Sequence, residues 1–341
     1  MALFVTGGAG FIGSNFIAAC LAARDEPVVN LDALTYAGNP ENLAEFEGDP
    51  RYHFVEGSIT DAGLVAEIFA RHEIRAVVHF AAESHVDRSI DAPAAFIDTN
   101  VGGTFCLLEA ARAYWEAKGG GEFRFVHIST DEVYGALAPD DAPFTEAHPY
   151  CPNSPYSASK AASDHLVHAY HHTYGLPALI THCSNNYGPR QLREKLIPCI
   201  IGNALRGDAI PVYGDGQQIR DWLYVEDHCA ALLRVLEAGE IGRVYNIGGA
   251  CEKTNLEVVE TICGLLDKKR PRPDGTSYAE LVAHVEDRLG HDRRYAVDVS
   301  RMRDELGWTA CESFASGIVK TLDWYLAREE AAAPRPEEKV V

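Results

Sequence analysis

Two short stretches of the sequence bring together side chains that could move protons and a hydride. The first is the motif STDEVYG, in which Thr130, Asp131 and Glu132 follow one another directly. The second is YSASK, in which Tyr156 and Lys160 lie four residues apart and would share one face of a helix. An ammonium group near a phenol stabilises the phenolate and lowers the tyrosine pKa. Such a tyrosine can take the proton of an alcohol while a nicotinamide takes the hydride.

The adjacent carboxyl groups of Asp131 and Glu132 exceed what a simple alcohol dehydrogenase needs. Oxidising an alcohol carbon to a ketone makes a proton on the neighbouring carbon acidic. A base could then remove that proton while an acid protonates a departing oxygen one carbon further along, and hydride return to that carbon would regenerate the cofactor. Two carboxyl groups in different protonation states suit this division of work. The alternative is that both acids only cap a turn, as acidic residues often do.

The elements predicted around these motifs place both at one edge of a sheet. An apolar run at 123–128 leads into the first motif and is typical of a buried strand. Apolar strands without polar alternation indicate a parallel sheet covered on both faces, and alternation with helices predicts a doubly wound, Rossmann-type α/β fold. The predicted strands are 2–6, 28–32, 53–56, 76–82, 123–128 and 178–183, and the predicted helices are 11–23, 61–71, 92–115 and 156–174.

The pattern becomes irregular after about residue 185, which predicts a smaller second lobe. Short strands at 210–213, 221–225 and 243–247 are mixed with helices at 195–206, 255–266 and 313–328. We therefore predict an NAD-binding domain over 1–185 with a returning segment near 221–250, and a partly interleaved substrate-binding lobe over 186–328. Residues 329–341 show no periodicity and are predicted to form a disordered tail.

The motif TGGAGFIG, between the first predicted strand and helix, is typical of a dinucleotide-binding turn. Gly8, Gly10 and Gly13 spell G-x-G-x-x-G, and Gly7 adds a wider glycine spacing. Asp32 ends the second predicted strand, where a carboxylate can bind the adenosine ribose and repel a 2′-phosphate. Because no Arg or Lys occurs in the ten residues after Asp32, the sequence favours NAD over NADP.

Composition and charge disfavour several classes of protein. No apolar run reaches the roughly 20 residues of a membrane span, and the net charge of −20 argues against nonspecific nucleic-acid binding. The nine cysteines form no C-x-x-C pair and suit free thiols in a reducing compartment, so we expect a cytoplasmic protein. His165, His168 and His172 lie at helical spacing, and we expect packing or surface roles rather than a metal site for them.

The motifs TGGAGFIGS, AAESHVDRSI, STDEVYG, YSASK, NNYGP and EKLIP together resemble the extended short-chain dehydrogenases that act on sugar nucleotides, and most closely their 4,6-dehydratases. The resemblance runs in order from residue 3 to about residue 325. It implies NAD as cofactor and a nucleotide sugar, dTDP-glucose, as substrate. It also implies a homodimer in which the helices at 92–115 and 156–174 form a four-helix bundle.

The resemblance also assigns residues to the site. It makes Asp131 the acid, Glu132 the base of the elimination, Tyr156 the base of the oxidation and Thr130 a hydroxyl partner for O4. The residues that it places against NAD are Gly7, Gly10, Phe11, Ile12, Gly13, Asp32, Ala33, Leu34, Thr35, Ser58, Ile59, Phe80, Ala81, Ala82, Ser84, Thr99, Tyr156, Lys160 and Asn186. Those that it places against the substrate are Ser84, Thr130, Asn185, Lys195, Leu196, Pro211, Val212, Tyr213, Arg220, Asn255, Arg288 and His291. Arg and Lys suit a diphosphate, and the stretch at 211–213 would form a platform for the pyrimidine base.

Two positions depart from the family pattern. Ser58 stands where the family usually has an Asp that contacts adenine, so we expect a weaker contact with NAD. Arg193 replaces a proline before EKLIP, so we expect a less rigid loop and leave the selectivity for the nucleotide base open.

Several other functions compete with the 4,6-dehydratase. A sugar-nucleotide epimerase or decarboxylase on the same fold, a dehydratase acting on UDP-glucose, and a catalytically silent NAD-binding regulator are the alternatives. The carboxyl pair argues against the epimerase, and the intact Thr130, Tyr156 and Lys160 argue against the regulator. The sequence does not indicate which pathway uses the product.

Overall fold

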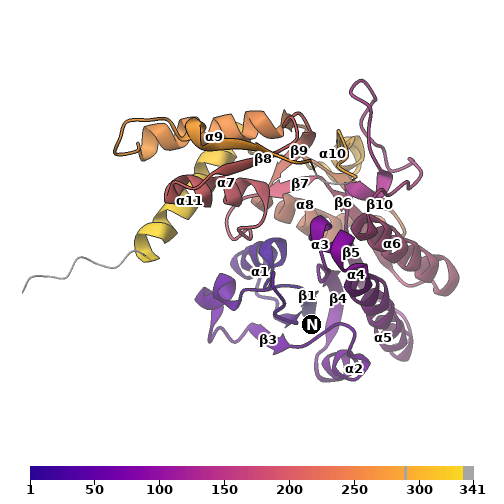
Figure 1. Cartoon of the computed structure of the whole chain (residues 1–341). Coiled ribbons are helices and arrows are strands. Elements are labelled where there is room, and N and C mark those ends of the chain that lie inside the picture. The colour runs from indigo at the N-terminus through magenta and orange to yellow at the C-terminus, as the bar shows by residue number, and fades with distance from the viewer. Residues whose placement is uncertain (288–289, 333–341) are drawn as a thin grey trace, which may run out of the picture.

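The computed structural model describes residues 1–287 and 290–332 of the 341-residue chain, and its centre is a seven-stranded sheet in which every neighbouring pair is parallel (Figure 1). The strands are β1 (Ala2–Thr6), β2 (Val28–Asp32), β3 (Tyr52–Glu56), β4 (Ile74–His79), β5 (Arg124–Thr130), β6 (Ala178–Cys183) and β10 (Val244–Ile247). They lie in the order β10-β6-β5-β4-β1-β2-β3. The doubly wound α/β fold predicted from the sequence is confirmed.

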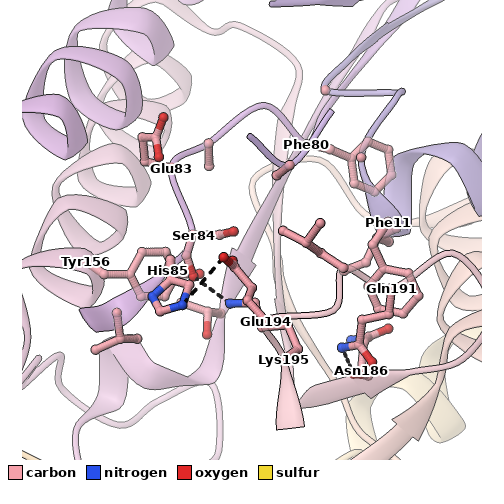
Figure 2. A pocket seen from close by; sticks show the side chains of 18 of the residues that line it. Phe11, Phe80, Glu83, Ser84, His85, Tyr156, Asn186, Gln191, Glu194 and Lys195 are labelled. Atoms are coloured by element: carbon pink, nitrogen blue, oxygen red, sulfur yellow. Dashed lines mark hydrogen bonds and ion pairs between the residues drawn. The ribbon is translucent and has the colours of Figure 1, made fainter. Parts of the chain in front are cut away.

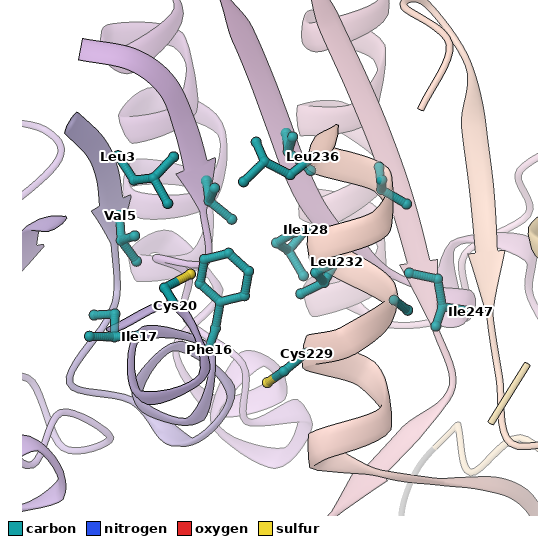
Figure 3. Packing of buried hydrophobic residues seen from close by; sticks show 14 of the residues in the cluster. Leu3, Val5, Phe16, Ile17, Cys20, Ile128, Cys229, Leu232, Leu236 and Ile247 are labelled. Atoms are coloured by element: carbon teal, nitrogen blue, oxygen red, sulfur yellow. The ribbon is translucent and has the colours of Figure 1, made fainter. Parts of the chain in front are cut away.

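Helices cover both faces of the sheet. The covering helices are α1 (Phe11–Ala23) and α8 (Val225–Ala238) on one face and α2 (Ala62–Arg71), α5 (Thr104–Ala117) and α6 (Pro155–Tyr174) on the other. The side chains of β1 alternate between the two faces, so both faces carry apolar side chains that helices cover. Leu3 and Val5 pack with Phe16 of α1 and Leu232 of α8 (Figure 3), whereas Phe4 packs edge-on against a ring of α2.

The second lobe lies over one edge of this sheet (Figure 1, pink and red to yellow). It contains a three-stranded sheet of β7 (Asn185–Tyr187), β9 (Ile219–Tyr224) and β11 (Glu252–Thr254), and a pair of β8 (Ile210–Tyr213) with β12 (Val282–Val285). Its helices are α7 (Leu196–Arg206), α9 (Asn255–Lys269) and α11 (Phe314–Ala332), whereas α10 (Ser300–Leu306) packs through Met302 and Leu306 into the core of the large sheet. Tyr187, Trp222 and Phe314 lie in the second lobe's own hydrophobic core, with Tyr187 and Phe314 centroids 5.2 Å apart.

The chain passes between the two parts more than once. After β9 it forms α8, which packs into the core of the large sheet, and then β10, which pairs with β6 through Val244 and Ile180. It then returns to the small sheet as β11. The exact division into domains at 1–185 and 186–328 stays a prediction.

The helix predicted at 92–115 is confirmed as a continuous helical run, but it is not α-helical throughout. It consists of α4 (Pro93–Phe96), a π-helical turn η2 (Ile97–Gly103) and α5, and the short helix α3 (Val86–Asp91) precedes it. The side chain of Asn100, on η2, accepts a hydrogen bond from Glu83 N at 2.8 Å and donates to Ser159 Oγ at 2.8 Å. Ser163 Oγ donates to the Asn100 carbonyl at 2.6 Å. These contacts with α6 fasten the widened turn, and periodicity alone does not report them.

Smaller differences concern the ends of elements. The strand predicted at 76–82 begins at Ile74 and ends at His79, and α11 continues to Ala332, into the segment predicted as a tail. Residues 333–341 lie outside the described residues. Three further short 3-10 helices are η1 (Pro40–Phe46), η3 (Asp131–Tyr134) and η4 (Tyr278–Leu281). Within the described ranges, no helix combines the length and the apolar character needed to cross a membrane.

Candidate active site

A cavity of about 560 Å³ is lined both by the carboxyl ends of the parallel strands and by residues of the second lobe. Ligands of open α/β sheets bind at this edge, and the cavity contains both motifs with which the sequence analysis began. Figure 2 shows part of its wall, where Tyr156 and His85 lie on one side and Phe11 and Gln191 on the other.

The glycine turn after β1 is shaped for a dinucleotide. Gly7 has φ +72°, and a Cβ there would lie 2.6 Å from Ala81 N. A Cβ on Gly13 would lie 2.3 Å from Gly7 O. Only glycine allows the strand, turn and α1 to approach this closely, which leaves backbone N–H groups at the helix N-terminus for a pyrophosphate.

Asp32 completes the fit to NAD. Its carboxylate is buried in the cavity wall, where Oδ2 accepts from Ala9 N at 2.8 Å and Oδ1 accepts from Leu34 N at 2.9 Å. Each carboxylate oxygen has a second lone pair with which to accept from a ribose hydroxyl. The residues present therefore fit NAD, and a 2′-phosphate would meet the Asp32 charge.

Most of the predicted binding residues line the same cavity, with three exceptions. Leu34 does not line it, and acts instead through the backbone N–H that holds Asp32. Val212 points into the hydrophobic core of the second lobe, behind Pro211 and Tyr213, because side chains alternate along β8. Arg288 lies outside the described residues.

The two acids stand where β5 ends. Thr130 is the last residue of the strand and caps η3, since its Oγ1 accepts from Glu132 N at 3.3 Å and donates to Asp131 Oδ1 at 3.4 Å. Asp131 is 2% exposed. Burial, followed by the charge of Glu132, raises the pKa of Asp131 well above its usual value, so this carboxyl group is suited to donate a proton.

Tyr156 and Lys160 lie at the start of α6. Ser154 caps this helix in a reciprocal capping box, and Pro155 follows as its first residue. Lys160 is buried, its Nζ donates to Ile128 O at 2.8 Å, and burial lowers its pKa to about 8. Burial of the hydroxyl and then the charge of Glu132 raise the pKa of Tyr156. The expectation that Lys160 lowers this pKa is therefore wrong for the protein alone, because desolvation of the phenolate dominates.

Sequence reasoning missed a set of charged contacts that joins the two lobes across the cavity. Glu194, just before α7, places Oε2 3.6 Å from His85 Nε2 (Figure 2). The same oxygen lies 3.9 Å from Arg88 Nη2. Lys195 Nζ donates to Ser84 O at 3.1 Å. The partners are far apart in the sequence, so the only signal was that they belong to the motifs AAESHVDRSI and EKLIP.

Arg220 lies in the part of the cavity wall that the second lobe forms. Its guanidinium lies 4.4 Å from the centre of the Tyr295 ring and donates to Asp292 O at 3.0 Å. His291, on the same wall, shares a hydrogen bond of 2.6 Å with Asp287. Basic side chains fixed in this way suit an anionic substrate group.

The two residues that depart from the family pattern, Ser58 and Arg193, both contact other side chains. Ser58 lines the cavity, and its hydroxyl lies 2.8 Å from the hydroxyl of Thr60. Arg193 forms an ion pair with Glu329 of α11, which ties the loop before α7 to the second lobe. The substitution of proline at this position is thus accompanied by a side-chain contact that restrains the loop.

The three histidines at helical spacing do not line the cavity, whereas two of the cysteines, Cys183 and Cys199, do. His168 and His172 stack on the exposed side of α6 with centroids 6.3 Å apart. The His165 ring lies 5.1 Å from that of Tyr150. All nine cysteines are free thiols.

Comparison with known proteins agrees with this geometry. Residues 4–321 match the family model described as GDP-mannose 4,6 dehydratase. The dTDP-glucose 4,6-dehydratase of Xanthomonas campestris is 58% identical over 328 residues, covering 95% of this chain and 93% of that protein. The dTDP-glucose 4,6-dehydratase 1 of Escherichia coli is 56% identical, covering 96% and 93%.

Solved structures give the same result. The Bacillus anthracis dTDP-glucose 4,6-dehydratase, in complex with NAD, superimposes with a TM-score of 0.86 at 45% identity, covering 97% of this chain and 98% of that one. A UDP-glucose 4-epimerase from Thermotoga maritima reaches a TM-score of 0.85 at 28% identity, covering 96% and 100%. The fold is thus shared with epimerases, whereas the higher identities are to dehydratases. The chain belongs to the family that the GDP-mannose 4,6 dehydratase model describes and, within it, to the dTDP-glucose 4,6-dehydratases.

Proposed function

We propose that this chain removes water from dTDP-glucose and forms dTDP-4-keto-6-deoxyglucose. The observation that carries the proposal is that Asp131, Glu132 and the Tyr156–Lys160 pair meet in one cavity with the glycine turn, and that burial raises the pKa of Asp131. An alcohol oxidation alone does not need the two acids, whereas an elimination does.

The oxidation uses the residues at the start of α6. Tyr156 takes the proton from O4 of the glucose, and the hydroxyl of Thr130 hydrogen-bonds to the same oxygen. Lys160 holds a positive charge below the phenolate. When bound, NAD would supply a positive charge and a site that can accept a hydride and give it back.

The elimination uses the residues of η3. Glu132 takes the proton from C5, which the C4 ketone has made acidic, and Asp131 gives its proton to O6, so that water departs. Glu132 then returns its proton to C5. The net loss is the proton of O4 and the hydroxide of C6, which together make one water.

This balance leaves one proton on Tyr156 and one missing from Asp131, so the proton must cross between them. Thr130 is placed for this transfer, because its hydroxyl donates to Asp131 Oδ1 at 3.4 Å and hydrogen-bonds with Tyr156. A hydroxyl both donates and accepts, so it can pass the proton on without itself ending up charged.

The second lobe would hold the nucleotide. Arg220, Lys195 and His291 offer positive charge or donors for the diphosphate, and Asn185 and Asn255 offer amide groups for its oxygens or for the sugar. The pyrimidine would lie on the Pro211 and Tyr213 platform, and Tyr213 is 42% exposed on the cavity wall.

We also propose a homodimer built on α5 and α6. Three large apolar side chains on this side of the protein are exposed, namely Ile97 at 52%, Phe105 at 50% and Tyr174 at 44%. Pairing of these helices with their copies would cover them.

The free thiols also support a cytoplasmic location.

Mass spectrometry of the product tests the activity. The purified protein with NAD is incubated with dTDP-glucose and, separately, with UDP-glucose. We expect loss of one water from the dTDP sugar without net consumption of NAD, and little change in the UDP sugar. With chromatographic separation before the mass measurement, a new peak of unchanged mass would indicate an epimerase, and loss of carbon dioxide when a nucleotide uronic acid is supplied instead would indicate a decarboxylase.

A further inference from the structure

The face of the large sheet that α6 covers turns polar toward the carboxyl ends of its strands. The side chains of Phe125 and Ile180 on this face belong to the hydrophobic core, but two residues further along β5 and β6 stand His127 and His182. His79 follows in the same row on β4, with its ring centre 5.1 Å from that of His127. All three histidines are at most 1% exposed, so this row lies inside the protein.

The carboxylate of Asp164, on α6, contacts this row of histidines. It lies one turn after Lys160 on α6 and is 1% exposed. Ser129 Oγ donates to its Oδ2 at 3.0 Å, and His182 Nε2 lies 3.0 Å from the same oxygen. His127 Nε2 lies 3.3 Å from its other oxygen, Oδ1.

Asp164 is a negative charge close to the uncharged rings of His127 and His79. Burial, and then the charge of Lys160, lower the pKa of His127 to about 4, so this ring is neutral near pH 7. Burial also lowers the pKa of His79. Burial opposes ionisation of Asp164, but the contacts with His127 and His182 outweigh it and hold its pKa below the usual range. The carboxylate is thus ionised within the protein interior.

Packing alone does not explain why the ionised carboxylate of Asp164 is buried here. Replacing buried charged groups by apolar side chains is often neutral or stabilising, so a carboxylate with several donors is not needed to dock a helix. Lys160 is the buried cation next to it, at i and i+4 on the same helix, and Nζ of Lys160 has the neutral Ile128 carbonyl as a hydrogen-bond partner. Burial pulls the pKa of Lys160 down, and the charge of Asp164 is the largest effect that opposes this.

Other titratable groups also surround the pair. They are His79, His127, His182 and Cys183 on the strands, Asp131, Glu132 and Tyr134 on η3, Tyr150 before α6 and Tyr156 on α6. Cys183 has its pKa raised to about 12 and is a neutral thiol.

We propose that Asp164, held by the row of histidines and Ser129, is a positioning residue that keeps Lys160 protonated beneath Tyr156. The proposal rests on the role proposed above for Lys160, but it assigns a function to a carboxylate that touches neither substrate nor cofactor. It also explains the polar row, which supplies the donors that make an ionised Asp164 tolerable in the interior.

The first test follows the oxidation step as a function of pH. Single-turnover reduction of bound NAD is measured in the unchanged protein, in Asp164→Asn, and in Tyr150→Phe as a matched control. Tyr150 hydroxyl lies 3.1 Å from His182 Nε2, so its loss disturbs the row without removing a charge. In the plot of rate against pH, we expect the fall of the rate at high pH to reflect loss of the Lys160 proton. In Asp164→Asn this fall should occur about one pH unit lower, as for loss of a nearby opposite charge. In Tyr150→Phe it should occur at the same pH as in the unchanged protein. A uniform drop in the rate of Asp164→Asn, with the fall at an unchanged pH, would overturn the proposal.

The second test uses stability and needs no substrate, so it does not depend on the proposed reaction. Thermal unfolding is compared for Lys160→Met, Asp164→Asn and the double variant. We expect Asp164→Asn to lower the melting temperature less when Lys160 has already been replaced, because no buried cation is then left without its counter-charge. Additive losses would show that the two residues act separately. Should Asp164→Asn alone fail to fold, the Lys160→Met replacement is expected to restore folding, and its failure to do so would refute the inference.

Discussion

Replacing Glu132 by Gln should separate the oxidation from the elimination. The side chain keeps its shape, and the backbone N–H that bonds to Thr130 is unaffected. Loss of a general base costs about 10²–10⁴ in rate, which corresponds to roughly 2.7–5.4 kcal/mol on the barrier of the elimination.

The same change should not slow the oxidation. The charge of Glu132 is the second largest cause of the raised pKa of Tyr156, after burial. Removing that charge therefore makes the phenol easier to deprotonate, and the 4-keto sugar should form at least as fast as in the unchanged protein. Reduced nicotinamide should accumulate, because the step that consumes it waits for the elimination.

Rapid-mixing absorbance of reduced nicotinamide measures the accumulation, and deuterium uptake from solvent at C5 measures the exchange of that proton. Tyr156→Phe is the control, since it should block the oxidation and give no absorbance signal. If Glu132→Gln keeps full turnover and normal exchange at C5, Glu132 is not the base, and another group at the end of β5 must take that role.

Four further outcomes are expected. Gly13→Ala should lose bound NAD, measured by absorbance of the purified protein, because its Cβ would lie 2.3 Å from the carbonyl oxygen of the first glycine in the turn. Asp32→Asn should weaken the preference for NAD over NADP by about tenfold or more in calorimetric titrations, as the charge facing a 2′-phosphate is removed. Phe105→Glu should give a monomer in light scattering, whereas a monomeric unchanged protein at micromolar concentration would contradict the dimer. Steady-state turnover should fall as rising pH ionises Asp131, whose pKa is raised, and Asp131→Asn should be slow at every pH.

The parts of the site that the sequence predicts are those defined by neighbouring residues. The glycine turn needs only residues close in the chain, and a Cβ at Gly7 or Gly13 would clash. Thr130, Asp131 and Glu132 follow directly on a buried strand, so their position at the end of β5 could be predicted from the strand alone. Tyr156 and Lys160 share a helix whose start is marked by a capping serine and a proline.

The parts that were missed depend on contacts between distant segments. The π-helical turn η2 exists because Asn100 bonds to Glu83 and to α6, which a helical pattern does not reveal. The contacts of Glu194 with His85 require the second lobe to be in place. The buried histidines of the sheet were hidden in strands that otherwise look apolar, since one polar residue barely alters the pattern of a strand.

The return of the chain to the large sheet has a consequence for synthesis. During translation β6 emerges well before β10, so it must wait as an edge strand with unpaired N–H and C=O groups. The face that α8 later covers stays exposed for the same interval, including the apolar side chains that pack with Leu232. The nucleotide-binding half therefore completes its sheet and core only after Ile247 has left the ribosome, although most of its strands come from the first half of the chain. Nascent chains stopped between β6 and β10 should bind chaperones that hold apolar surface, and should release them once β10 is added.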